Sequence, residues 1–127
     1  MPQVMLIQVQ NNPQKLVKIV EQATLHFQRA ESLQILVENT TSAEYIDKLL
    51  WSHPPESFLP HGGELISIGQ TIDLNARHYF NLTAEALVEL ALGTIYEFDD
   101  QSSPHKQEAF KRRYHAYKRA GFAIISI

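Results

Sequence analysis

The residues of this sequence with the clearest capacity for chemistry are basic and aromatic side chains near its C-terminus. Residues 106–127 carry six Lys and Arg residues and one acid, whereas residues 1–105 carry five basic and 13 acidic residues. Ammonium groups bind carboxylates, and a neighbouring aromatic ring offers an apolar surface. At helical spacing these side chains form one face, the basic stripe, which consists of Gln107, Lys111, Tyr114, His115 and Lys118. The stripe indicates a receptor for an acidic peptide with an apolar end, and the alternative is a solvated face of a surface helix.

Nucleic acid is a second class of anionic partner for the same segment. The chain as a whole has a net charge of -3, and its first 105 residues are acidic. An acidic body disfavours broad contact with a phosphate backbone, and single-stranded nucleic acid also needs several aromatic stacking platforms. The charge distribution therefore favours a peptide partner, with a small nucleic-acid-binding module as the alternative function.

A second candidate surface is the loop that follows a predicted helix at residues 41–51. Trp51 and Phe58 lie close in sequence to three prolines, of which Pro54 is the first. Proline restricts the backbone and so lowers the entropy lost on binding, and exposed aromatic residues on a rigid frame are frequent hot spots. The alternative is that both rings cover the core at a helix end.

No pattern typical of an enzyme or a metal site occurs. Among six histidines only His53 and His61 flank one loop, and a metal site needs three or four converging ligands. Cysteine is absent, which excludes disulfides. The turn at residues 10–13 lacks the glycines that let a backbone approach a dinucleotide. We expect a non-catalytic protein without cofactor or metal.

Hydrophobic periodicity and turn residues predict strands alternating with helices. Strands are expected at residues 4–9, 33–37, 65–68, 78–82, 94–98 and 122–127, and helices at residues 13–30, 41–51, 84–92 and 104–120. This alternation is typical of a mainly parallel sheet with helices on both faces. The predicted fold is a single three-layer α/β domain over residues 1–127, Rossmann-like but without a nucleotide loop.

Short polar residues predict where these helices begin. Asn12 precedes a first-turn proline, Thr41 and Glu44 fit a capping box, and Gly121 suits the end of the last helix. Arg113 falls inside the apolar arc of the last helix, so it is expected to pair with an acid at the preceding strand end or to extend into solvent. The remaining expected caps are Thr83 and Ser103, and the acids available to Arg113 are Glu97, Asp99 and Asp100.

Membrane association and export are not indicated. No apolar run approaches the roughly 18 residues of a membrane span, and the first ten residues lack the basic region of an export signal. The absence of cysteine is compatible with a reducing compartment. A cytoplasmic protein without a membrane partner is expected.

Two segments resemble chi subunits of the bacterial DNA polymerase III clamp-loader complex. LLWSHPPESFLPHG at residues 49–62 is similar to the family's Leu-Trp-x-x-Pro-x-Glu-Ser-Phe-x-Pro-His stretch, and RYHAYKRAGF at residues 113–122 is similar to its C-terminal Arg-Tyr-x-x-Tyr-Arg-x-x-Gly-Phe helix. Their order and separation also agree. Residues 63–78 are short for the family and do not align.

The resemblance implies two protein interfaces and no catalytic site. The psi subunit would bind the tryptophan–proline loop through Trp51, Pro54 and Phe58. The acidic C-terminal tail of single-stranded DNA-binding protein would bind the basic stripe, so that DNA is reached only indirectly. Two positions depart from the family: Gln107 replaces a usual lysine, and His115, where lysine is common, offers less charge at neutral pH.

Overall fold

The computed structural model describes residues 2–52, 65–90 and 93–127. In these residues six strands form one sheet in the order β3-β2-β4-β5-β1-β6. Every pair of neighbouring strands is parallel, which confirms the predicted α/β class. The strands are β1 (Gln3–Val9), β2 (Leu33–Leu36), β3 (Ile66–Gly69), β4 (His78–Asn81), β5 (Thr94–Asp100) and β6 (Ala123–Ser126).

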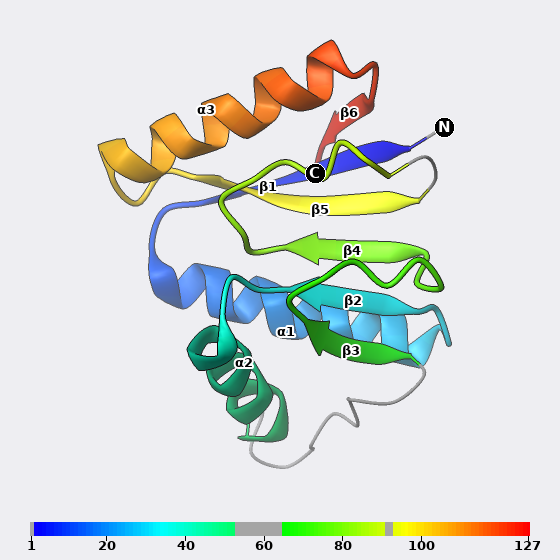
Figure 1. Ribbon diagram of the computed structural model, residues 1–127. Coiled ribbons are helices and arrows are strands. Elements are labelled where there is room, and N and C mark those ends of the chain that lie inside the picture. The colour runs from blue at the N-terminus through cyan, green and yellow to red at the C-terminus, as the bar shows by residue number, and fades with distance from the viewer. Residues whose placement is uncertain (1, 53–64, 91–92) are drawn as a thin grey trace.

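Helices cover both faces of this sheet, as expected for three layers. The helices are α1 (Asn12–Gln28), α2 (Thr40–Ser52) and α3 (Pro104–Arg119). Figure 1 shows α1 and α2 on one side of the sheet and α3 on the other, beside β5, β1 and β6. The core divides accordingly, because Ile7 and Val9 of β1 pack in the cluster with α1 and α2, whereas Val4 and Leu6 pack in the cluster with Tyr117 of α3.

Two of the predicted helix starts are wrong by one or two residues. The cap of α1 is Asn11 rather than Asn12, because the Asn11 side-chain oxygen accepts the backbone N–H of Gln14 at 2.9 Å. Asn39 caps α2 in place of Thr41, and its side-chain oxygen accepts the N–H of Ser42 at 2.9 Å. In each case an earlier asparagine supplies the acceptor.

The start and end of α3 agree with the sequence prediction. The Ser103 side chain caps the helix by accepting the N–H of Lys106 at 3.2 Å, and Pro104 is the first helical residue. Gly121 follows with a φ of 85°, the left-handed conformation that favours glycine. The ends of α3 therefore follow from its local sequence.

The helix predicted at residues 84–92 does not form in the part that the structure describes, residues 84–90. Thr83 is not its cap, because the Thr83 hydroxyl donates to the side-chain oxygen of Asn81 at 2.7 Å. The N–H of Leu87 donates to the Tyr117 hydroxyl of α3 at 3.0 Å instead of to a helical carbonyl. Tertiary hydrogen bonds and the burial of Leu87 and Leu90 thus replace helical ones.

Candidate functional site

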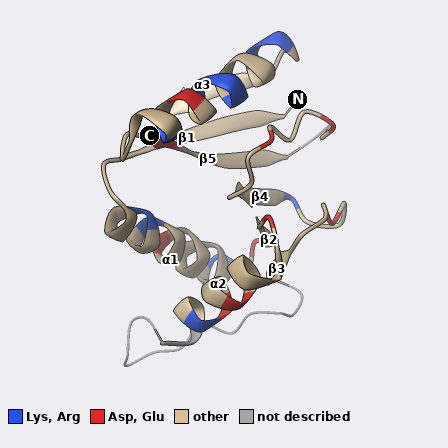
Figure 2. Ribbon diagram, turned by 60° about the vertical axis from the view of Figure 1, so that its left-hand side comes forward, with Lys and Arg blue, Asp and Glu red and all other residues tan. Residues whose placement is uncertain are grey.

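The basic stripe lies along the side of α3 that faces β6. Tyr117 points into the core and is 1% exposed, while Arg113 turns to one side of it and bonds Glu97 on β5. At roughly 100° per residue, Tyr114 lies on the opposite side of Tyr117 from Arg113. Because the strand order continues β5-β1-β6, that side is the one toward β6. Figure 2 shows Lys and Arg residues recurring along α3.

Two members of the stripe, His115 and Lys118, contact the ring of a third, Tyr114. The His115 ring meets it edge-on with centroids 5.6 Å apart, and the Lys118 Nζ lies 5.8 Å from its centroid. Phe110 lies on the inner side, with its centroid 6.0 Å away. A half-buried aromatic ring that already holds a cation offers both an apolar contact and positive charge to a ligand.

The other two members lie nearer the start of α3. Lys111 is one turn before Tyr114 and is exposed, and its Nζ is 3.7 Å from Glu108 Oε1. Both of those side chains are more than 60% exposed, so the ion pair is weak and the Lys111 ammonium can exchange Glu108 for another carboxylate. Gln107 is half-buried, and its side-chain amide donates to the backbone oxygen of Gln101 at 3.5 Å.

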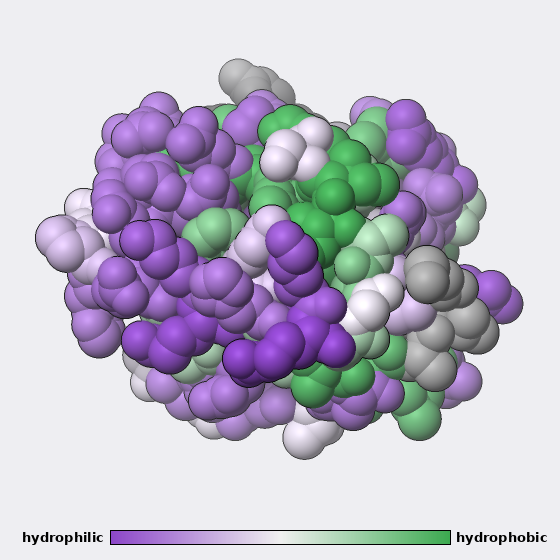
Figure 3. Space-filling view, turned by 90° about the horizontal axis from the view of Figure 1, so that it is seen from above, coloured by the Kyte–Doolittle hydropathy of each residue, from purple (hydrophilic) through white to green (hydrophobic). Residues whose placement is uncertain are grey.

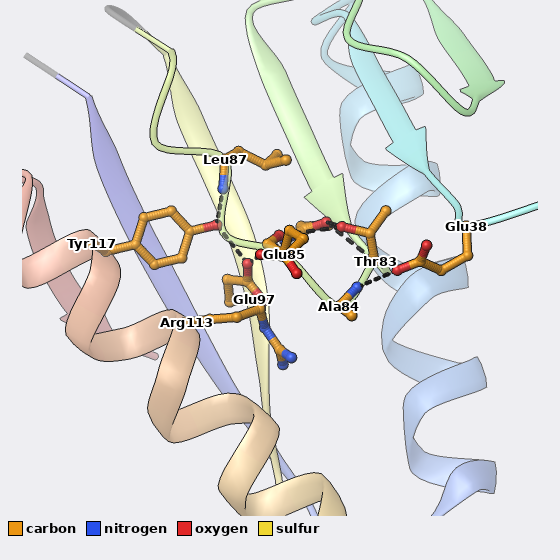
Figure 4. A network of polar contacts seen from close by, with 9 residues as sticks. Glu38, Thr83, Ala84, Glu85, Leu87, Glu97, Arg113 and Tyr117 are labelled. Carbon is orange, nitrogen blue, oxygen red and sulfur yellow. Dashed lines mark hydrogen bonds and ion pairs between the residues drawn. The ribbon is translucent and has the colours of Figure 1, made fainter.

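A buried carboxylate fixes the position of α3 on the sheet. Glu97 of β5 is 1% exposed and accepts three hydrogen bonds: from Arg113 Nε at 2.9 Å, from the Tyr117 hydroxyl at 2.5 Å and from Asn81 Nδ2 at 2.6 Å. Figure 4 shows this carboxylate between α3 and the segment after β4. Burial raises the pKa of Glu97, and the Arg113 charge and the hydrogen bonds oppose that shift. Burial also raises the pKa of Tyr117, so its hydroxyl stays a donor.

The network continues from Glu97 through the segment after β4 to Glu38, which follows β2. Asn81 Nδ2 also donates to the backbone oxygen of Glu85, and Glu38 accepts the N–H of Ala84 at 2.5 Å. The Arg113–Glu97 pair is one of the alternatives that the sequence predicts. Asn81 and the Tyr117 hydroxyl were not predicted as partners of Glu97, because neither interrupts an apolar pattern as the charge of Arg113 does.

The tryptophan–proline loop is only partly within the described residues. Trp51 lies in the last turn of α2, whereas Pro54 and Phe58 lie outside the described residues, as do His53 and His61. The geometry of this predicted surface therefore stays a prediction.

The turn after β1 is held by its own side chains. The N–H of Gln10 donates to Gln14 Oε1 at 2.6 Å, and Asn11 accepts the N–H of Gln14. Side-chain oxygens thus occupy amides that a phosphate at this turn would need. The adjoining open hollow, about 390 Å³ in volume, is lined by Gln8, Pro13, Gln14, Val17 and Lys18.

Two further properties concern metals and membranes. Within residues 2–52, 65–90 and 93–127, no three His, Asp or Glu side chains converge as metal ligands would. Among the same residues no helix combines the length and apolar character of a membrane span.

A second buried cluster surrounds His26 at the amino ends of β4 and β5. His26 is 2% exposed, its Nε2 lies 2.7 Å from the Tyr96 hydroxyl, and its ring contacts His78 at a centroid distance of 4.5 Å. The Nδ1 atom has no hydrogen-bond partner among the described residues, and the Glu31 carboxylate lies 3.8 Å away. Burial lowers the pKa of His26, the charge of His78 adds to this, and Glu31 opposes it.

Acidification is therefore expected to destabilise the protein through His26. The unfolded chain binds a proton near the ordinary pKa of 6.5, whereas the folded chain does so only at lower pH. The free energy of unfolding should fall as pH drops below 6.5 and level off once His26 is protonated in the folded state. Urea unfolding of the natural chain and of His26→Gln, across this pH range, measures the effect. In His26→Gln the free energy of unfolding should depend less steeply on pH, whereas in the exposed variant His105→Gln the dependence should be unchanged. An equally steep dependence in all three proteins would show that His26 is not the group responsible.

One protein family matches nearly the whole chain. Residues 1–125 match the family described as DNA polymerase III chi subunit, HolC. No curated protein matches the chain.

Proposed function

The chain belongs to the DNA polymerase III chi subunit family, since that family's model matches residues 1–125 of 127, and we propose that it links single-stranded DNA-binding protein to the clamp loader. Family membership makes it an accessory subunit of DNA polymerase III. In the proposed role the basic stripe binds the acidic C-terminal tail of single-stranded DNA-binding protein, and a separate surface binds the psi subunit. No catalytic step is assigned to the chain.

The observation that carries the tail-binding proposal is the grouping of Tyr114, His115 and Lys118 next to exposed Lys111. The tail is acidic and ends in phenylalanine. Its carboxylates would meet the Lys111 and Lys118 ammonium groups, and its aromatic end would contact the half-buried Tyr114 ring. Charge and apolar contact are thus available within two turns of one helix.

The psi subunit is proposed to bind the tryptophan–proline loop through Trp51, Pro54 and Phe58. This part rests on the sequence similarity of residues 49–62 to the family's motif. Aromatic residues framed by prolines lose little entropy on binding. Co-purification of the chain with psi, compared between the natural protein and Trp51→Ala, tests this surface; undiminished recovery would reject it.

A calorimetric titration is expected to separate peptide binding from nucleic-acid binding. The chain should bind a synthetic acidic peptide ending in Asp-Ile-Pro-Phe and should show no comparable heat with single-stranded oligonucleotide. Because the Debye length shortens from about 10 Å at 0.1 M to about 3 Å at 1 M salt, affinity for the peptide should fall as salt rises. A peptide with its acids replaced by amides is the matched control.

The opposite result would favour the alternative function. Tight oligonucleotide binding without peptide binding would indicate a small nucleic-acid-binding module that uses the basic face of α3. A peptide affinity independent of salt would remove the electrostatic basis of the proposal.

A further inference from the structure

Among residues 2–52, 65–90 and 93–127, none pairs with the outer side of the β6 backbone. This strand forms an edge of the sheet, with β1 as its neighbour. The N–H groups of Ala123 and Ile127 donate to carbonyl oxygens at β1, at 3.4 and 2.9 Å. Backbone groups alternate in direction along a strand, so those of Ile124 and Ser126 point away from β1. Residues 123–127 contain no charge and no proline, the features that commonly block pairing at an edge.

The two faces of the sheet differ at this edge. On the face that α3 covers, half-buried Ile124 and Tyr114 pack against the same core cluster. On the other face Ile125 and Ile127 are 42% and 58% exposed, and neighbouring Met5 is half-buried. Figure 3 looks onto the α3 and β6 side of the molecule and shows a hydrophobic patch beside hydrophilic residues. An additional strand here would meet positive charge on one face and apolar side chains on the other.

We propose that the free edge of β6 accepts an extended acidic peptide as an additional strand. The outward backbone groups of Ile124 and Ser126 pair with the peptide backbone. Alternate peptide side chains then point toward the α3 face, where acidic residues reach Lys111 and Lys118, and toward the other face, where apolar residues cover Ile125. The inference rests on the proposed function, because it describes how the tail peptide reaches the basic stripe.

Charge complementarity identifies this occupant. The helix beside this edge, α3, belongs to a segment with six basic residues and one acid. An acidic strand is therefore attracted to it electrostatically, whereas a neutral or basic strand is not. Backbone hydrogen bonds supply affinity without regard to sequence, and the alternating side chains supply selectivity. Recognition would therefore require acidic residues at every second position of the paired segment, which precedes the aromatic end of the peptide.

Ser126→Pro is expected to weaken binding of the acidic peptide ending in Asp-Ile-Pro-Phe at least tenfold. Proline removes the outward N–H of residue 126 and leaves the bonds from β6 to β1 in place, and it is tolerated where an edge N–H faces solvent. Ser126→Ala is the matched control, since it keeps the N–H and should bind as the natural chain does. Fluorescence anisotropy measures the affinities, and circular dichroism checks that each variant is folded.

Amide hydrogen exchange gives a second measurement that does not depend on a variant. Addition of the peptide to the natural chain should slow exchange at the amides of Ile124 and Ser126. Unchanged exchange at both amides would overturn the strand proposal.

A charge reversal on α3 separates this inference from the proposed function. If Ser126→Pro binds the peptide as the natural chain does while Lys111→Glu does not, the peptide docks on α3 alone, and only the strand proposal fails. If the peptide binds neither the natural chain nor any variant, the proposed function fails with it.

Discussion

Glu97→Ala is expected to lower the free energy of unfolding by about 3–5 kcal/mol, the range for removing one partner of a buried ion pair. The carboxylate is 1% exposed and accepts hydrogen bonds from three side chains. Its removal leaves Arg113, 11% exposed, without its counter-charge, and it leaves the Tyr117 hydroxyl and one of the two Asn81 Nδ2 hydrogens without this acceptor. Urea denaturation followed by circular dichroism measures the loss.

Two further variants show whether this loss comes from the network. Glu97→Gln keeps the volume and one acceptor oxygen, so it should cost less than Glu97→Ala. Glu89 is exposed in the segment between β4 and β5, and Glu89→Ala should change stability by no more than about 0.5 kcal/mol. A Glu97→Ala protein as stable as Glu89→Ala would mean that the buried contacts do not hold α3 to the sheet.

The fold was predictable in outline except for the segment between β4 and β5, and the network explains this exception. Apolar runs such as the one at residues 33–37 become central strands, because a parallel sheet buried on both faces requires them. Residues 84–90 carry local helix signals, yet the N–H of Leu87 bonds the Tyr117 hydroxyl, 30 positions away. A contact at that distance in the chain has no local signature, and it overrides helix propensity.

The caps of α1 and α2 were predicted at the wrong residues for a different reason. Neighbouring polar residues, Asn11 with Asn12 and Asn39 with Thr41, each offer a side-chain oxygen that could accept a first-turn amide. Which of the two residues caps the helix depends on where the preceding strand ends. At Ser103 the following proline fixes the first helical residue, and there the sequence prediction agrees with the structure.

The basic stripe was predictable as a set because residues three and four apart share a helix face. The sequence indicated that Arg113 differs from the stripe, since it falls in the apolar arc, and its bond to Glu97 agrees with that interpretation. The sequence did not indicate that the stripe faces the open edge of β6, because that relation depends on the order of β5, β1 and β6 in the sheet. Strand order is set by tertiary packing rather than by local pattern.

Lys111→Glu is expected to weaken tail-peptide binding by about ten- to a hundredfold, the effect of losing one charge-assisted hydrogen bond worth roughly 1.5–3 kcal/mol. The new carboxylate would also repel an acidic ligand and would lie beside Glu108, the present partner of Lys111. Stability should change little, because the Lys111 side chain is 63% exposed and its ion pair is weak. Calorimetric titration with the peptide ending in Asp-Ile-Pro-Phe measures the affinity.

Arg112→Glu is the matched control for this prediction. Arg112 is the next residue of α3 and is exposed, but it lies roughly 100° further around the helix and outside the basic stripe. Both variants change the net charge equally, so long-range attraction of an acidic peptide falls by a similar amount in each. Only Lys111→Glu should also lose the direct contact between the peptide and residue 111, which lies beside Tyr114 and Lys118 in the basic stripe. Equal weakening in the two variants would show that the peptide responds to overall charge alone, and the stripe would then not be a binding site.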